Sequence, residues 1–156
     1  MDWREQSTAN CSVARTLEVI GEKWTILVLR EVFNGVRRFD DIQRHIGIPR
    51  PILSDRLHRL LDGGVLRRIE YREPGQRARH EYRLTETGLE LQTVLLSLME
   101  WGDRHPAGAG GPARVVRHRG CGAPVHVALV CEAGHSVASP RDVVGEDGPG
   151  ARQLTA

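Results

Sequence analysis

The segment from Pro51 to Leu61 constrains the fold more than any other part of this chain. Its apolar stripe consists of leucines at spacings of four, seven and eight residues, namely Leu53, Leu57, Leu60 and Leu61. This spacing predicts an amphipathic helix with one face in a core. Pro51 suits the first turn of such a helix, because its missing N–H would have no partner there. Gly63 and Gly64 follow the stripe and end the helix.

The elements on either side of this helix predict the fold class. Before it, apolar patterns that end at glycine predict helices at Ser12–Ile20, Glu22–Phe33 and Phe39–Ile46. After it come strand candidates at Val65–Tyr71 and His80–Leu84, a Pro74-Gly75 turn between them, and a long helix from a Thr85 cap to about Asp103. Two helices joined by a tight glycine turn and followed by a hairpin form a winged helix-turn-helix. We therefore predict a mainly α fold with a small β-hairpin wing (α+β) and a short C-terminal β-rich tail.

Positive charge is concentrated in the same central region. Residues 36–84 hold 12 Lys or Arg against 7 Asp or Glu, a balance of +5 in a chain whose net charge is +2. The regions on both sides are slightly acidic. A basic centre between acidic flanks indicates a local site for a polyanion. Charge alone leaves open the alternative of an arginine-rich surface without a ligand.

The outward face of the Pro51–Leu61 helix predicts contacts with double-stranded DNA. The major groove admits a helix, arginine can bond guanine in two-pronged fashion, and an apolar side chain suits a thymine methyl group. The residues expected to contact DNA from this helix are Arg50, Ile52, Ser54, Asp55, Arg56 and Arg59. As an alternative, Arg56 and Arg59 pair only with nearby acids such as Asp55 and Asp62.

The hairpin tip and the residues before the third helix add further arginines. The tip from Tyr71 to His80 carries Arg72, Arg77 and Arg79 and one acid, Glu73. Arginines on a flexible tip suit the negative minor groove and its phosphates, and Arg37 and Arg38 are expected to hold backbone phosphates. One alternative is a turn that its charges merely keep soluble. Another is a winged helix that binds protein instead of DNA, which would not need these arginines.

The last predicted helix carries two apolar rows. Leu91, Leu95 and Leu98 form one row, and Leu89, Leu96 and Met99 form the other. One row can pack on the domain, while the other would stay in water at a cost of about 25 cal/mol per Å². We therefore expect a homodimer through Leu91, Leu95, Leu98 and Met99, with two recognition helices about one DNA turn apart. Burial of these residues under the C-terminal tail is the alternative.

Composition divides the chain into a body and a tail. A Gly- and Pro-rich stretch predicts a linker at 106–112, after a DNA-binding and dimerisation domain at 1–105. A small tail follows at 113–145, and a flexible end at 146–156. No cofactor is required, but the tail offers four possible zinc ligands, His118, Cys121, Cys131 and His135. A zinc ribbon would have a second cysteine where Gly134 stands, so a metal-free hairpin is the alternative, with strands near Val115–His118, Val125–Val130 and Ser136–Val137.

Several classes of protein do not fit the sequence. No run of 18 apolar residues is present, so we expect no membrane span. The first residues lack the basic-then-apolar layout of a signal peptide, and three cysteines far apart suit a reducing compartment, so a cytoplasmic location is expected. The chain has no glycine-rich phosphate loop, no nucleophile elbow and no His-Glu-x-x-His pair, so we do not expect an enzyme.

Four segments together resemble the HxlR-type transcriptional regulators, in the order and spacing of that family. They are Cys11–Arg30, Arg38–Ile42, Leu53–Leu57 and Glu81–Gly88, and the resemblance covers about residues 11–103. It implies a MarR-like winged-helix homodimer that represses or activates nearby genes, with the first and last helices forming the dimer. Some members sense oxidants or electrophiles through a cysteine at the position of Cys11, so the resemblance implies a redox effector, and a free cysteine buried before an apolar helix is the alternative. A small hydrophobic molecule in a cleft between the apolar helices of a dimer is the second candidate effector.

Overall fold

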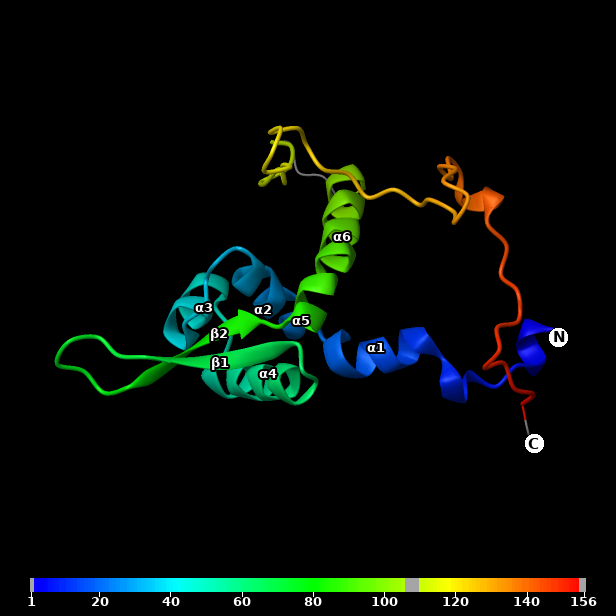
Figure 1. Ribbon diagram of the computed structural model, residues 1–156. Helices are drawn as coiled ribbons and strands as arrows, with labels where there is room; N and C mark the ends of the chain where they lie inside the picture. The colour runs from blue at the N-terminus through cyan, green and yellow to red at the C-terminus, as the bar shows by residue number, and fades with distance from the viewer. Residues whose placement is uncertain (1, 106–109, 155–156) are drawn as a thin grey trace. The chain divides into compact units, whose positions relative to one another are not determined.

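The computed structural model describes residues 2–105 and 110–154 (Figure 1). The chain divides into two compact units. The first is Val13–Leu95, and the second joins the residues up to Ser12 with those from Leu96 onward. Part of the predicted linker, residues 106–109, and the last two residues of the predicted flexible end lie outside the described residues.

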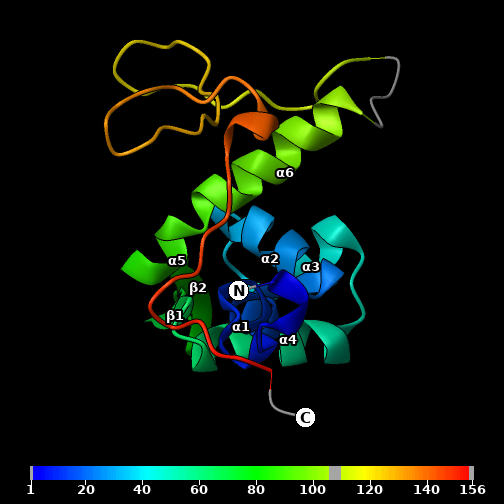
Figure 2. The same cartoon turned by 90° about the vertical axis from the view of Figure 1, so that its right-hand side faces the viewer.

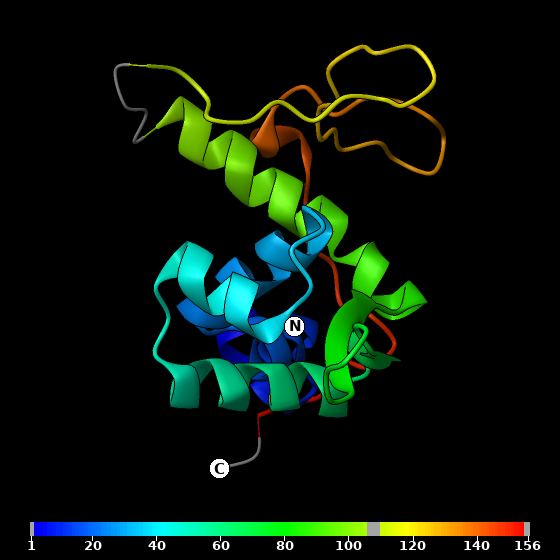
Figure 3. The same cartoon turned by 90° about the vertical axis from the view of Figure 1, so that its left-hand side faces the viewer.

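The helices of the first unit begin and end close to the predicted residues. Their bounds are α1 (Ser12–Ile20), α2 (Lys23–Phe33), α3 (Phe39–Ile46) and α4 (Arg50–Asp62). Gly47 ends α3 in the left-handed conformation at a φ of +66°, where a side chain would be strained. Only Gly47, Ile48 and Pro49 separate α3 from α4, and Ile48 is fully buried. Figures 2 and 3 show α4 running beneath α2 and α3 from two opposite sides.

The leucine stripe of α4 lies at the centre of the core. Leu53, Leu57 and Leu60 are at most 1% exposed, and Leu61 packs against them while partly buried. The side chains that complete the core come from α1, α2, α3 and the start of the hairpin: Ile20, Val28, Leu29, Val32, Ile42, Ile48, Val65 and Leu66. The predicted buried face of α4 is therefore confirmed, and its other face is available for a ligand.

The predicted hairpin is confirmed and is joined to α3 at its base. Strands β1 (Leu66–Tyr71) and β2 (Arg79–Leu84) pair antiparallel, with Leu66 opposite Leu84. Arg38 forms an isolated bridge with Glu81, and the Tyr82 N–H donates to the Arg37 carbonyl at 2.8 Å. The base of the wing is therefore connected to the residues that begin α3.

The long helix predicted after the wing is interrupted at Leu91. Thr85 caps the first piece, α5 (Glu86–Glu90), by accepting the Gly88 N–H, and α6 (Gln92–Arg104) follows. The Leu91 N–H donates to the Gly88 carbonyl, three residues back, which is the tighter spacing of a 3₁₀ turn. Gly88 is buried, and its backbone lies very close to the start of the wing. A Cβ at this position would lie 2.2 Å from the Val65 carbonyl oxygen. The expectation of one continuous helix is thus wrong, and Thr85 is the cap.

The second unit contains little regular structure. Besides part of α6 it holds three short 3₁₀ helices, η1 (Trp3–Glu5), η2 (Thr8–Asn10) and η3 (Pro140–Asp142). Where tail strands are predicted, the described residues show isolated bridges, Arg117 with Pro124 and Val130 with Ser136. Gln153, within the predicted flexible end, pairs with Gln6. Among the described residues, no helix is long and apolar enough to cross a membrane.

Candidate DNA interface

The outward face of α4 presents a mixed surface to solvent. Pro51, Ile52, Asp55, His58 and Arg59 are exposed there, and Ser54 is half-buried. The Gln43 side chain donates to the Ile48 carbonyl at 3.2 Å, which fixes the turn that leads into α4. The helix therefore has a defined start and an exposed face with donors, acceptors and one apolar group, as a helix in the major groove requires.

Arg56 and Arg59 both face Asp55. The Arg59 Nε lies 3.2 Å from the Asp55 carboxylate, one turn away on the helix. The Arg56 Nη1 lies 3.5 Å from Asp55 and 3.9 Å from Glu22, and its side chain is only 14% exposed. In the free chain both arginines thus lie beside Asp55, as expected if they only pair with nearby acids. A base contact by Arg56 requires the guanidinium to leave Asp55 and Glu22, whereas Arg59 is already at the surface.

His58 connects the recognition helix to the wing. Its Nδ1 lies 2.7 Å from the Ser54 carbonyl, and its Nε2 lies 3.3 Å from the Arg68 guanidinium on β1. A carbonyl only accepts and a guanidinium only donates, so in this arrangement Nδ1 donates to Ser54 and Nε2 accepts from Arg68. Sequence reasoning missed Arg68. The alternation of a strand shows that its side chain points outward, but not that it contacts His58 on α4.

Two further predicted arginines are held at the beginning of α3 and α4. Arg50 lies 2.7 Å from Asp40, with its guanidinium over the Phe39 ring. Arg38 lies 2.7 Å from Glu73 and stacks over the Tyr71 ring at 4.2 Å. The hydrogen bond that Arg38 donates to the Glu73 carboxylate raises the pKa of Arg38 from its ordinary value, so the guanidinium stays charged. Both cations are positioned before any ligand arrives.

Four arginines predicted to contact DNA have side chains without an ion-pair partner among the described residues. The side chains of Arg37, Arg72, Arg77 and Arg79 are exposed and make no ion pair with any other described residue. Arg77 belongs to the wing tip, while Arg79 begins β2. Cations without carboxylate partners are the ones most available to phosphates.

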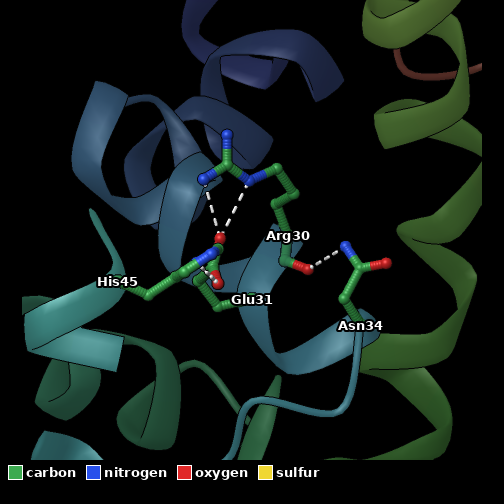
Figure 4. A network of polar contacts seen from close by, with 4 residues as sticks. All are labelled: Arg30, Glu31, Asn34 and His45. Atoms are coloured by element: carbon green, nitrogen blue, oxygen red, sulfur yellow. Dashed lines mark hydrogen bonds and ion pairs between the residues drawn. The ribbon is translucent and has the colours of Figure 1, made fainter. Parts of the chain in front are cut away.

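A buried carboxylate fixes α3 against α2 (Figure 4). Glu31 is 2% exposed, and its carboxylate accepts from Arg30 at 2.7 and 2.9 Å and contacts the His45 Nδ1 at 2.5 Å. The Asn34 side chain donates to the Arg30 carbonyl at the end of α2. Sequence reasoning missed this network, because Glu31 is an ordinary polar position in a helix until α3 places His45 beside it.

Apolar side chains remain exposed on α1 and α6. Val13 and Leu17 on α1 are 67% and 54% exposed. On α6, Val94, Leu98 and Trp101 are exposed at helical spacing, whereas Leu91 and Leu95 pack against the core of their own chain. Met99 is half-buried. Of the predicted dimer residues, Leu98 therefore lies on the open face, and sequence reasoning missed Val94 and Trp101.

The three cysteines are free thiols in different surroundings. Cys11 is half-buried directly before α1, and Cys121 and Cys131 are exposed in the tail. His118 lies beside Cys121 and His135 beside Cys131, but no group of three or more possible metal ligands occurs among the described residues. The four predicted ligands thus form two separate pairs.

Comparison with known proteins gives a consistent assignment. Residues 19–108 match the family described as HxlR-like helix-turn-helix. The chain is 45% identical over 139 residues to the uncharacterized HTH-type transcriptional regulator Rv3095 of Mycobacterium tuberculosis, covering 89% of this chain and 87% of that protein. Among solved structures it is similar to PA1607, a putative transcription factor, with a TM-score of 0.76, 31% identity and coverage of 89% and 96%.

A redox regulator is also among the similar structures. The reduced form of HypR matches with a TM-score of 0.51 and 32% identity, over 58% of this chain and 88% of that one. The names of these relatives and similar structures are those of transcriptional regulators, transcription factors or redox regulators. The chain therefore belongs to the HxlR family of helix-turn-helix transcriptional regulators.

Proposed function

We propose that this regulator binds a specific site in double-stranded DNA as a homodimer, with α4 in the major groove and the wing on the minor groove and backbone. The observation that carries this proposal is the position of Arg72, Arg77 and Arg79, which are exposed and without ion-pair partners among the described residues. They lie on the hairpin whose base is connected to α4 through His58 and Arg68. The proposed place of action is the cytoplasm, where DNA is accessible.

The proposed contacts divide into two kinds. Ile52, Ser54, Asp55, Arg56 and Arg59 on α4 read base edges, and their contribution depends on sequence. The remaining residues hold the sugar-phosphate backbone independently of sequence: Arg37, Arg38, Arg50, Arg72, Arg77 and Arg79. Arg59 is exposed and has to leave only Asp55 to engage a base, while Arg56 is largely covered and has to leave both Asp55 and Glu22.

The exposed apolar faces of α1 and α6 support the homodimer. Val94, Leu98 and Trp101 follow one face of α6, and Val13 and Leu17 one face of α1. Covering them with a second copy removes apolar surface from water, which is favourable by about 25 cal/mol per Å². Met99 adjoins this face, and Leu91 and Leu95 support the helix from the side of the core.

Cys11 is the proposed position for redox control. It directly precedes α1, so oxidation there changes the surroundings of a helix in the proposed dimer. Similarity to the redox regulator HypR supports this kind of effector. A small hydrophobic ligand between the subunits is the other candidate effector.

The domain scheme that goes with this function is a body at 1–105, a linker at 106–112, a tail at 113–145 and an end at 146–156.

A titration of the purified protein against DNA at several salt concentrations tests the function. Fragments from the region upstream of its own gene are compared with random duplex of equal length. We expect tighter binding to an upstream fragment and an affinity that falls steeply with salt. A folded dimer that binds neither duplex at low salt, with or without oxidant, would favour a module that binds protein instead.

A further inference from the structure

Two turns in the tail each bring one cysteine and one histidine together. In the first, the His118 Nδ1 lies 3.2 Å from the Cys121 Sγ, and the Gly122 N–H closes the turn on the His118 carbonyl. In the second, the His135 Nδ1 lies 3.7 Å from the Cys131 Sγ, and the Cys131 N–H donates to the His135 carbonyl. All four side chains are exposed.

The separations within the two pairs suit a tetrahedral zinc ion. Zinc binds sulfur at about 2.3 Å and imidazole nitrogen at about 2.0–2.1 Å, so two such ligands lie about 3.6 Å apart at a tetrahedral angle. The observed distances of 3.2 and 3.7 Å are close to that value. Each turn therefore offers half of the four ligands that a structural zinc site takes.

The two turns lie at opposite ends of one stretch of chain, residues 123–131. In the first turn the Val125 N–H pairs with the Val116 carbonyl, and in the second the Val137 N–H pairs with the Leu129 carbonyl. Figure 1 shows the two loops, one yellow and one orange, well apart. An extended stretch of this length spans up to about 26 Å. The two pairs therefore do not form one site within a single chain as it is folded here.

The middle of this stretch is attached to α6. The Val127 N–H donates to the Glu100 carboxylate at 2.8 Å, and the His126 Nδ1 lies 3.5 Å from the same oxygen. Folding the stretch back on itself to join the two turns would require a sharp reversal of the chain at this attachment. A second chain avoids that step.

The two cysteines are placed symmetrically in the sequence about this attachment, and the two histidines nearly so. Cys121 and Cys131 each lie five residues from His126. If two copies of the stretch run antiparallel about a two-fold axis near His126, the first turn of one copy meets the second turn of the other. The exposed face of α6, which carries Leu98 and Trp101, is the surface already proposed for the dimer.

We propose that two zinc ions bridge the subunits of the dimer, each held by His118 and Cys121 of one chain and by Cys131 and His135 of the other. This inference rests on the proposed homodimer. On binding, each zinc replaces the protons of two thiols, so two protons are released per site and no oxidant or reductant takes part. The same pairing covers apolar side chains that are open in one chain, among them Leu129 and Val130 at 58% and 59% exposure.

Zinc content of the full-length protein is the first test. The protein is loaded with equimolar zinc and dialysed, and its metal content and mass in solution are measured. We expect a dimer with one zinc per chain. The homodimers of His118→Ala/Cys121→Ser and of Cys131→Ser/His135→Ala should each retain none. The control Cys11→Ser/His80→Ala, which also lacks one cysteine and one histidine, should retain wild-type zinc.

A mixed dimer separates a shared site from a site within one chain. The two turn variants are given different affinity tags, produced together, and the heterodimer is isolated. A shared site predicts that one of its two sites is intact, so the heterodimer holds half the zinc of the wild-type dimer. A site within one chain predicts none, because every chain then has a damaged half.

Three results would overturn the proposal. They are a wild-type dimer without retained zinc, a heterodimer without zinc, and a zinc-loaded wild-type protein that is monomeric in sedimentation. Only the third also contradicts the proposed homodimer, and DNA binding is measured separately on the same samples. Visible absorption of Co²⁺ in place of zinc reports thiolate ligation and should disappear in both turn variants.

Discussion

Removing Arg77 and Arg79 should make DNA binding markedly less dependent on salt. Both side chains are exposed and have no ion-pair partner among the described residues, so each is free to neutralise one phosphate. A dimer of Arg77→Ala/Arg79→Ala lacks four such cations. At about 0.9 per phosphate, the slope of log affinity against log salt should become shallower by about 3.6. Between 50 and 200 mM salt, the wild type should then lose about 150-fold more affinity than the variant.

The assay is fluorescence anisotropy of a labelled duplex at five or six salt concentrations, on both the upstream fragment and random DNA. The matched control is Arg114→Ala/Arg141→Ala, which removes the same charge from exposed tail positions and should leave the slope near that of the wild type. Equal slopes for the wild type and the wing variant would refute the phosphate role of these arginines. A similar change in the control would show an effect of net charge alone.

Three further substitutions test the fold and the dimer. Leu98→Glu with Trp101→Glu places charge on the exposed face of α6 and should give monomers in sedimentation, and a surviving dimer would mean a different interface. Glu31→Ala removes a buried acceptor of charged hydrogen bonds and should lower the free energy of unfolding in urea by about 2–3 kcal/mol. The exposed Glu18→Ala should change it little. Gly88→Ala forces a Cβ against the Val65 carbonyl and should cost about 1–3 kcal/mol, whereas Gly102→Ala in α6 has open space and should gain about 0.5–1 kcal/mol.

Local patterns were sufficient for the fold of the first unit. The leucine spacing of α4, the glycine that ends α3 and the Thr85 cap each act within a few residues of chain, so their structural outcome can be derived from sequence. The break at Leu91 could not, because it accompanies the close approach of Gly88 to Val65 in the wing. That contact exists only once the hairpin has folded.

The candidate site was less predictable than the fold. A helical wheel shows that Arg56 lies on the flank of α4, but Glu22, one of its partners, is supplied by the residue before α2. The same limit applies to α6, where the wheel groups Leu95 with Leu98 although the folded chain buries the former more than the latter. Which side of a helix faces the core depends on the angle at which it packs.

The attachment of the wing to α3 has a thermodynamic consequence. Arg38 bridges to Glu81, pairs with Glu73 and stacks on Tyr71, so one residue holds both strands of the hairpin to the start of α3. The wing is therefore held to α3 at Glu81 and, on the other strand, as far as Tyr71 and Glu73 in the free protein. DNA has to immobilise only the remainder of the tip, and the loss of conformational entropy on binding is limited to those few residues. Amide exchange should accordingly be slow at Tyr82, whose N–H is bonded to Arg37, and fast at Arg77.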